Sequence, residues 1–178
     1  MDYHKAEEDL VRRIAAGDSE AFEKLYEAYR KPLANYLYRL CFDRALVEDL
    51  LQEVFVRIWR AAASFRAESK VSTFIFRIAT NVWINESRRL REKPAEAAAD
   101  RVQSGEPGEE LERREREARV RDALRTLPAG ERAVLILAEY NGLPYEEIAR
   151  VLEVPVGTVK SRMFHALQRL RDRLRNKF

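Results

Sequence analysis

The sequence predicts an all-α protein made of two small helical domains that are joined by a flexible acidic linker. Glycine and proline number only 6 each among 178 residues, which is below their usual share. The tight hairpins of an all-β sandwich or barrel are therefore close to excluded. No glycine occurs between Gly17 and Gly105, and this stretch is rich in residues that favour helix. Hydrophobic residues make up 46% of the chain, enough for small packed cores.

Charge is unevenly distributed along the chain, although the formal net charge is only +3. Five successive blocks carry −2 over residues 1–65, +4 over 66–93, −5 over 94–112, zero over 113–155 and +6 over 156–178. The acidic block also contains two glycines and two prolines without apolar periodicity, which is typical of a linker. We therefore expect a first domain over residues 1–92, a linker over 93–112 and a second domain over 113–178.

The composition argues against several classes of protein. The single cysteine, Cys41, has no partner for a disulfide, and the two histidines lie far apart, so no zinc site is expected. No apolar run is long enough to span a membrane, and the acidic N-terminus differs from a signal peptide, which favours a soluble, cytoplasmic protein. No nucleophile–base pair, metal-ligand set or phosphate-binding loop is evident, so we expect no enzyme, no cofactor and no small-molecule substrate.

Three helices are expected before residue 65. An apolar cluster marks the first, which Gly17 can end through a left-handed cap. Asp18 or Ser19 then caps a second helix, in which Pro32 is expected to cause a kink or a break. Asp43 begins the third helix, which has one apolar and one polar face. The apolar, inward face is formed by Val47, Leu50, Leu51, Val54, Phe55, Ile58 and Trp59. The polar face is acidic, and it is either a solvated surface or a surface for a basic protein partner.

A loop and a fourth helix complete the first domain. Residues Phe65 to Val71 interrupt the helical pattern, and Ser72 can cap a helix from about Thr73 to Leu90. Beside its inward stripe, this helix carries a polar stripe at positions i, i+4, i+8 and i+11, made of Arg77, Asn81, Asn85 and Arg88, with Arg89 next to it.

Aromatic residues accompany this polar stripe. Side-chain amides, guanidinium groups and aromatic rings together suit unstacked bases better than an intact duplex. Phe74 lies on the inward stripe, which favours a place in the core. For Phe76 and Trp83 the sequence leaves core packing and base stacking equally open.

The second domain contains a helix-turn-helix pattern. Four helices are expected over residues 111–126, 130–140, 144–152 and from Gly157 or Thr158 to the end of the chain, with a four-residue turn at 153–156. Ala149 is small where two of these helices should cross closely, and Thr158 is placed to cap the last helix.

The last helix has separate apolar and basic faces. Its apolar face is formed by Val159, Met163, Ala166, Leu167, Leu170 and Leu174. Its outward face and flanks are formed by Lys160, Ser161, Phe164, His165, Gln168 and arginines at positions 162, 169, 171, 173 and 175. Such a helix can enter a major groove, with base edges read near its N-terminus and phosphates held by arginines. A solvated surface helix is the alternative.

Three motifs occur in one order along nearly the whole chain. Residues 48–59 (EDLLQEVFVRIW) resemble the polymerase-binding helix of bacterial sigma factors. Residues 65–81 resemble their promoter-melting segment, and residues 145–162 resemble their second DNA-binding domain. Together the motifs are similar to the extracytoplasmic-function (ECF) group of the sigma-70 family.

The resemblance implies a transcription initiation factor whose partners are the two largest subunits of core RNA polymerase, promoter DNA and an anti-sigma protein. Polymerase would be bound by Asp49, Leu50, Gln52 and Glu53. The −10 element and its melted strand would be bound by Phe65, Arg66, Ser69, Lys70, Arg77, Asn81, Asn85, Arg88 and Arg89. The −35 duplex would be bound by Thr158, Lys160, Ser161, Arg162, Phe164, His165 and Arg169.

The chain departs from the family pattern at three positions. Glu153 stands where the family often has Gly or Asn, and a positive φ there would cost a Glu about 1 kcal/mol. Phe74 stands where Trp is common, and His165 stands where some members have an arginine that reads bases. A stand-alone helix-turn-helix regulator remains the alternative function, although that class usually binds DNA as a dimer.

Overall fold

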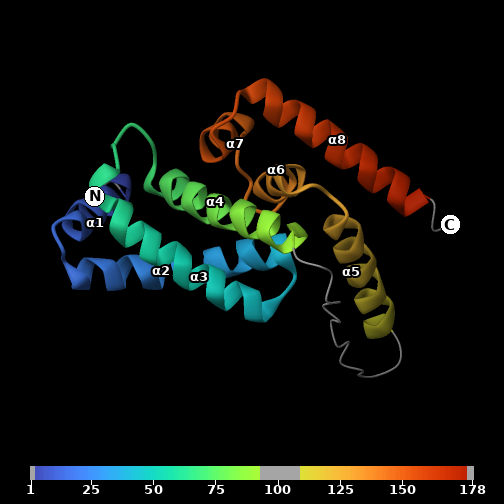
Figure 1. Cartoon of the computed structure of the whole chain (residues 1–178), viewed down its shortest axis with the longest axis horizontal. Helices are drawn as coiled ribbons and strands as arrows, with labels where there is room; N and C mark the ends of the chain where they lie inside the picture. Colours follow the sequence, from blue (N-terminus) through green and yellow to red (C-terminus); the bar gives the residue numbers. More distant parts are fainter. Residues whose placement is uncertain (1–2, 93–108, 176–178) are drawn as a thin grey trace.

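The computed structural model describes residues 3–92 and 109–175, and within these ranges all regular structure is helical, as predicted (Figure 1). The first domain consists of α1 (Tyr3–Ala15), α2 (Ser19–Cys41), α3 (Arg44–Ala61), the 3-10 turn η1 (Ala62–Ser64) and α4 (Val71–Glu92). The second consists of α5 (Glu109–Arg125), α6 (Ala129–Glu139), α7 (Tyr145–Leu152) and α8 (Val156–Arg175). Most of the predicted linker, residues 93–108, lies outside the described residues, and its last four residues begin α5.

Local signals place the starts of α2 and α3. The Asp18 carboxylate accepts a hydrogen bond from the backbone N–H of Ala21 at 3.1 Å, and Asp43 accepts one from Leu46 at 3.2 Å. These are N-caps, which satisfy donors that the first helical turn leaves free. Gly17 has a φ of 88°, as expected for the left-handed residue that follows α1. Of the kink or break expected at Pro32, the break is wrong, because α2 continues through Pro32 as one helix.

Helix α4 begins earlier than predicted. The carbonyl oxygen of Lys70 accepts a bond from the N–H of Phe74 at 3.2 Å, so Ser72 lies inside the helix and does not cap it. The three aromatic residues that accompany the polar stripe lie in the core. Phe74, Phe76 and Trp83 are only 2%, 8% and 5% exposed. None of the three can stack on a base in this arrangement.

The turn between α7 and α8 contains a strained residue. Glu153 has a φ of 52° and a ψ of 45°, which is the left-handed region. The family's usual Gly or Asn would meet this geometry more easily than Glu does. Helix α8 begins at Val156, so Thr158 lies in its first turn and is not its N-cap, contrary to expectation. Ala149 is buried where α7 crosses its neighbours, as predicted.

Only the first half of the predicted apolar face of α8 is buried. Val159, Met163 and Ala166 pack in the core, whereas Leu167 and Leu174 are 49% and 39% exposed. The prediction is wrong for these two leucines, because α8 extends beyond α6 and α7 and its contact with α5 leaves them partly exposed.

The two domains pack against each other. Helix α4 of the first domain lies against α7 and α6, and α2 also contacts α6. The buried Arg132 of α6 donates to the carbonyl oxygens of Leu40 and, within its own domain, of Arg125 and Leu127. Its guanidinium carbon lies 5.6 Å from the ring centroid of Trp83 on α4. Burial lowers the pKa of Arg132 to about 10, so the side chain is still charged at neutral pH.

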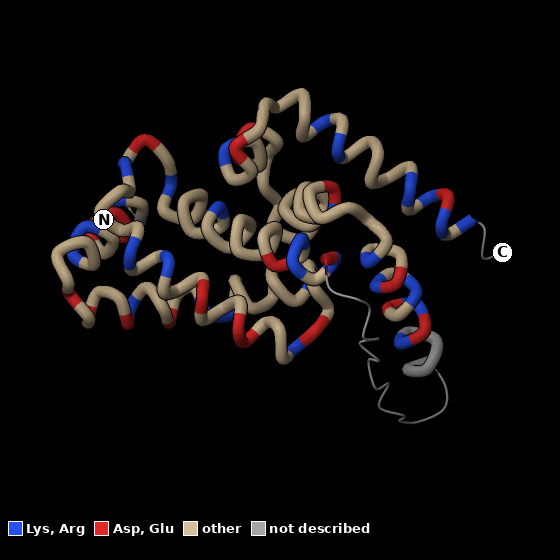
Figure 2. Tube along the Cα trace, viewed as in Figure 1, with Lys and Arg blue, Asp and Glu red and all other residues tan. Residues whose placement is uncertain are grey.

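Charge follows the helices that the sequence pattern singled out. Lys and Arg recur along α8, where Asp172 is the single acidic residue (Figure 2). Acidic positions occur along α2 and α3, on the other side of the first domain from α7.

Glu153 permits a direct test of the left-handed strain. We expect Glu153→Gly to be about 1 kcal/mol more stable than Glu153→Ala. Both variants lose the same carboxylate, but only alanine keeps the Cβ that is strained at positive φ. Urea denaturation followed by circular dichroism measures the difference, and equal midpoints for the two variants would show that the turn stores no strain.

Candidate nucleic-acid and polymerase interfaces

The polar stripe of α4 forms one continuous surface. Asn81, Asn85 and Arg88 are exposed, and Arg77 is half-buried. The Arg77 guanidinium lies 5.8 Å from the ring centroid of Phe74 and forms an ion pair with Glu153 at 3.3 Å. The neighbouring Arg89 is exposed and pairs with Glu86 at 3.1 Å. Amides beside guanidinium groups can bind both the edges of bases and the phosphates that link them.

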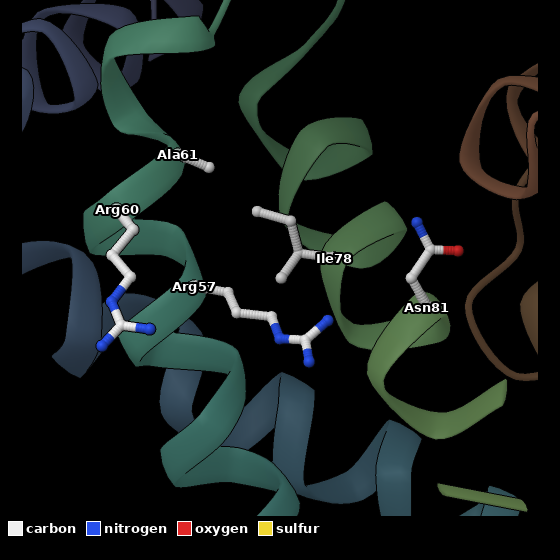
Figure 3. Close-up of a pocket in the computed structure, with 5 residues that line it drawn as sticks. All are labelled: Arg57, Arg60, Ala61, Ile78 and Asn81. Carbon is white, nitrogen blue, oxygen red and sulfur yellow. The ribbon is translucent and has the colours of Figure 1, made fainter. Parts of the chain in front are cut away.

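A hollow between α3 and α4 adds two arginines to this surface. It has a volume of about 320 Å³ and is lined by Arg57, Arg60, Ala61, Ile78 and Asn81. Figure 3 shows Arg57 reaching from α3 into the space between the two helices. Glu53 holds Arg57 through a 2.6 Å hydrogen bond. Sequence reasoning did not assign a DNA contact to either arginine; their i, i+3 spacing just before the loop was the available signal.

The loop between η1 and α4 lies beside the polar stripe. The Phe65 ring packs on Phe74 with centroids 5.2 Å apart, so Phe65 is half-buried. Arg66 is exposed, Ser69 is half-buried, and the exposed Lys70 donates to the carboxylate of Glu147 on α7. The loop therefore offers two cations, of which Lys70 is engaged by the second domain.

The acidic face of α3 has an apolar centre that the sequence did not predict. Asp49, Gln52 and Glu53 are exposed, whereas Leu50 is only 4% exposed and packs in the core. Leu50 therefore offers no side-chain surface to a partner. On the exposed side, Val56 is 41% exposed and Trp59 is 39% exposed.

The burial of Trp59 was predicted incorrectly. Its ring packs edge-on against Phe22 with centroids 5.2 Å apart, which covers one face and leaves the other to solvent. Exposed aromatic and aliphatic side chains with a charged rim are typical of protein–protein interfaces.

Helix α8 presents an exposed polar and aromatic face, which we call its recognition face because the sequence predicts that it reads DNA. Lys160, Ser161, Phe164 and His165 are exposed, and Phe164 is 64% exposed. The rings of Phe164 and His165 meet edge-on with centroids 5.6 Å apart. Side chains of this kind project far enough from a helix to contact base edges in a major groove.

The remaining predicted α8 residues are partly engaged within the domain. The half-buried Arg162 lies over α6, where a Cβ at Gly130 would come within 3.2 Å of its guanidinium. Arg169 is exposed and pairs with Glu131 at 3.2 Å. The half-buried Thr158 accepts a hydrogen bond from Ser161 at its carbonyl oxygen.

The thiol of Cys41 is shielded in the structure. Burial raises the pKa of the Cys41 thiol, whose Sγ donates to the carbonyl oxygen of Asp43 at 3.4 Å, and a protonated thiol is a poor nucleophile. Residues 3–92 and 109–175 bring together no three His, Cys, Asp or Glu side chains suited to a metal ion. Within the same ranges no helix has the length and apolar character that crossing a membrane requires.

Comparison with known proteins gives a family match for each of the two domains. Two protein-family models match the chain: Sigma-70 region 2 over residues 25–93 and Sigma-70, region 4 over residues 117–170. The first match covers the α3 and α4 surfaces, and the second covers most of the helix-turn-helix domain.

Relatives match over nearly the whole chain. The RNA polymerase sigma-H factor of Pseudomonas aeruginosa is 34% identical, over 90% of this chain and 89% of its own. The ECF RNA polymerase sigma-E factor of Haemophilus influenzae is 32% identical, over 93% of each chain.

A solved structure shares the fold of the chain. The sigma factor RpoE of Bartonella quintana, in complex with the anti-sigma factor NepR, is similar with a TM-score of 0.65 and 25% identity, over 86% of this chain and 96% of that one. The two family matches and the curated relatives lead to one conclusion: the chain belongs to the ECF group of the sigma-70 family of RNA polymerase sigma factors.

Proposed function

We propose that this sigma factor divides promoter recognition between its two domains. Residues 1–92 bind the −10 element and help to melt it, residues 93–112 connect the domains, and residues 113–178 bind the −35 element as duplex. The observation that carries this proposal is the contrast between α4 and α8. The α4 stripe combines amides and guanidinium groups beside an arginine-lined hollow. Helix α8 instead exposes one face of a long helix, which is the form that major-groove readers use.

Melting requires no bond-making chemistry from the chain. Extruding a base from the duplex costs a few kcal/mol, and contacts made only to the open strand offset part of that cost. Arg77, Asn81 and Asn85 would hold unstacked bases and their phosphates, together with Arg88, Arg89 and the loop residues Phe65, Arg66, Ser69 and Lys70. We include Arg57 and Arg60, because they line the same hollow as Asn81. Catalysis would be left to polymerase.

The duplex contact would be made by the exposed face of α8. Lys160, Ser161, Phe164 and His165 have free access to a groove, and Arg169 lies near enough to the same face to reach phosphate. Thr158 and Arg162 are half-buried, so we assign them a supporting role at the edge of the contact.

Polymerase would be bound by the acidic face of α3. Asp49, Gln52 and Glu53 form its charged rim, and Val56 with Trp59 forms its apolar centre. An acidic rim suits a basic partner surface. We further propose that the chain acts in the cytoplasm and is regulated in trans by an anti-sigma protein, as in the complex of the similar Bartonella sigma factor.

Run-off transcription with core polymerase tests the function as a whole. The chain is expected to make core polymerase start at a defined set of promoters, with transcripts that disappear when the chain is omitted. Tight binding to duplex DNA without any stimulation of core polymerase would instead favour a stand-alone regulator.

The division of labour predicts selective defects. The double variant Arg77→Ala, Asn81→Ala should impair promoter opening at least tenfold while leaving −35 duplex binding within about twofold, since the two helices contact different DNA. Permanganate footprinting measures opening, and gel shift measures duplex binding. Arg12→Ala, which removes an exposed arginine of α1, is the control. Equal loss of both activities would contradict the assignment.

Salt dependence distinguishes the kinds of contact made by α8. If Lys160 contacts phosphate, Lys160→Ala should weaken binding similarly on all duplexes and reduce the slope of log affinity against log salt by about 1. His165→Ala should instead change sequence preference more than slope. A Lys160→Ala variant with an unchanged slope would rule out the phosphate contact.

A further inference from the structure

Two glutamates of the second domain form ion pairs with cationic side chains of the first. Lys70 of the loop pairs with Glu147 of α7, and Arg77 of α4 pairs with Glu153 at the turn after α7. These partners lie 77 and 76 residues apart in the chain, so both pairs exist only because the domains are packed together. Both cations belong to the surface that we assign to the melted −10 strand.

We propose that the helix-turn-helix domain is an internal inhibitor of the −10 surface, in which Glu147 and Glu153 take the places of DNA phosphates on Lys70 and Arg77. A carboxylate and a phosphate oxygen make the same charge-assisted bonds to ammonium and guanidinium groups. The strand and the two glutamates therefore compete for the same donors. This inference rests on the proposed role of Lys70 and Arg77 in binding DNA.

The identity of Glu153 supports the inhibitory contact. Its left-handed conformation is unfavourable for any residue with a Cβ, and its carboxylate contributes to the fold of its own domain through no ion pair within residues 114–175. Its ion pair is made across the domain boundary. An inter-domain role explains why a strained turn carries an acid in this chain.

A DNA strand could replace the glutamates in these two ion pairs. The side chains of Arg77 and Glu153 are 39% and 61% exposed, and those of Lys70 and Glu147 are 48% and 12% exposed. The Arg77–Glu153 pair is open to water on both sides and is therefore weak, so a single strand with several phosphates can replace it. In the Lys70–Glu147 pair the carboxylate is largely buried, and an incoming phosphate can reach the exposed ammonium group. A second, buried part of the domain contact lies elsewhere, at Arg132 and Trp83.

Neutralising the two glutamates should therefore release the −10 surface. The test compares the full chain with the double variant Glu147→Gln, Glu153→Gln in fluorescence anisotropy, using a short labelled single-stranded DNA of mixed sequence at one low salt concentration. We expect the variant to bind the strand about threefold to tenfold more tightly than the unmodified chain.

A matched control distinguishes relief of inhibition from a general effect of the change in net charge. Glu139 and Glu146 are exposed residues of the same domain, and neither forms an ion pair with α4 in the described part of the chain. The control variant Glu139→Gln, Glu146→Gln changes the net charge by the same amount. Its affinity should stay within about twofold of the unmodified chain, and an equal gain in both double variants would overturn the proposal.

A third variant distinguishes the failure of this inference from the failure of the proposed function. If Lys70→Ala, Arg77→Ala leaves strand binding unchanged, these residues do not bind DNA and the proposed function is wrong at this surface. If that variant loses binding while Glu147→Gln, Glu153→Gln gains none, the DNA surface stands and only the inhibitory role is overturned.

Hydrogen exchange gives an independent readout on the unmodified chain. Binding of the single strand should increase exchange in peptides that cover α7, since the strand displaces this helix from α4. Unchanged or slower exchange in α7 at saturating strand would contradict competition between them.

Discussion

The arrangement of the two domains depends on one buried side chain. Arg132 has 8% of its surface exposed and donates to carbonyl oxygens on both sides of the domain boundary. Leu40 lies at the C-terminal end of α2, where carbonyl groups lack helical partners and attract positive charge. A buried charge is costly without such partners. The Leu40 carbonyl, as an acceptor for one terminal nitrogen of Arg132, therefore holds α6 against α2, and Trp83 adds a contact with α4.

This packing brings the surface proposed for the melted strand together with the glutamates proposed to inhibit it. With α6 seated on the first domain, α7 lies against α4, and its glutamates reach Lys70 and Arg77. The recognition face of α8 and the acidic face of α3 remain exposed. The surfaces proposed for duplex and for polymerase are thus available while the surface proposed for the melted strand is partly occupied. This difference in availability suits a sigma factor that binds single-stranded DNA only after it has bound polymerase and the promoter duplex.

Local sequence signals predicted the structural features that depend only on residues close together in the chain. Asp18 and Asp43 cap their helices as expected, because a cap is set by residues three positions apart. The α4 stripe and the outward face of α8 follow from helical periodicity. Predictions that required knowledge of packing were less successful. Leu167 is 49% exposed, and Trp59 is covered by α2 on one face only. Phe76 and Trp83, which the sequence left open, are buried because α2 and α6 cover them.

The sequence alone determined the helical class, the family and the chemistry available on each helix, because composition, periodicity and motif order are properties of the chain itself. Only the tertiary structure decided which of those groups meet. It placed Arg57 and Arg60 beside Asn81, left Trp59 partly exposed and paired Glu153 with Arg77. The physical reason is that contacts between residues many turns apart depend on how helices pack, and packing is a property of all the buried side chains together.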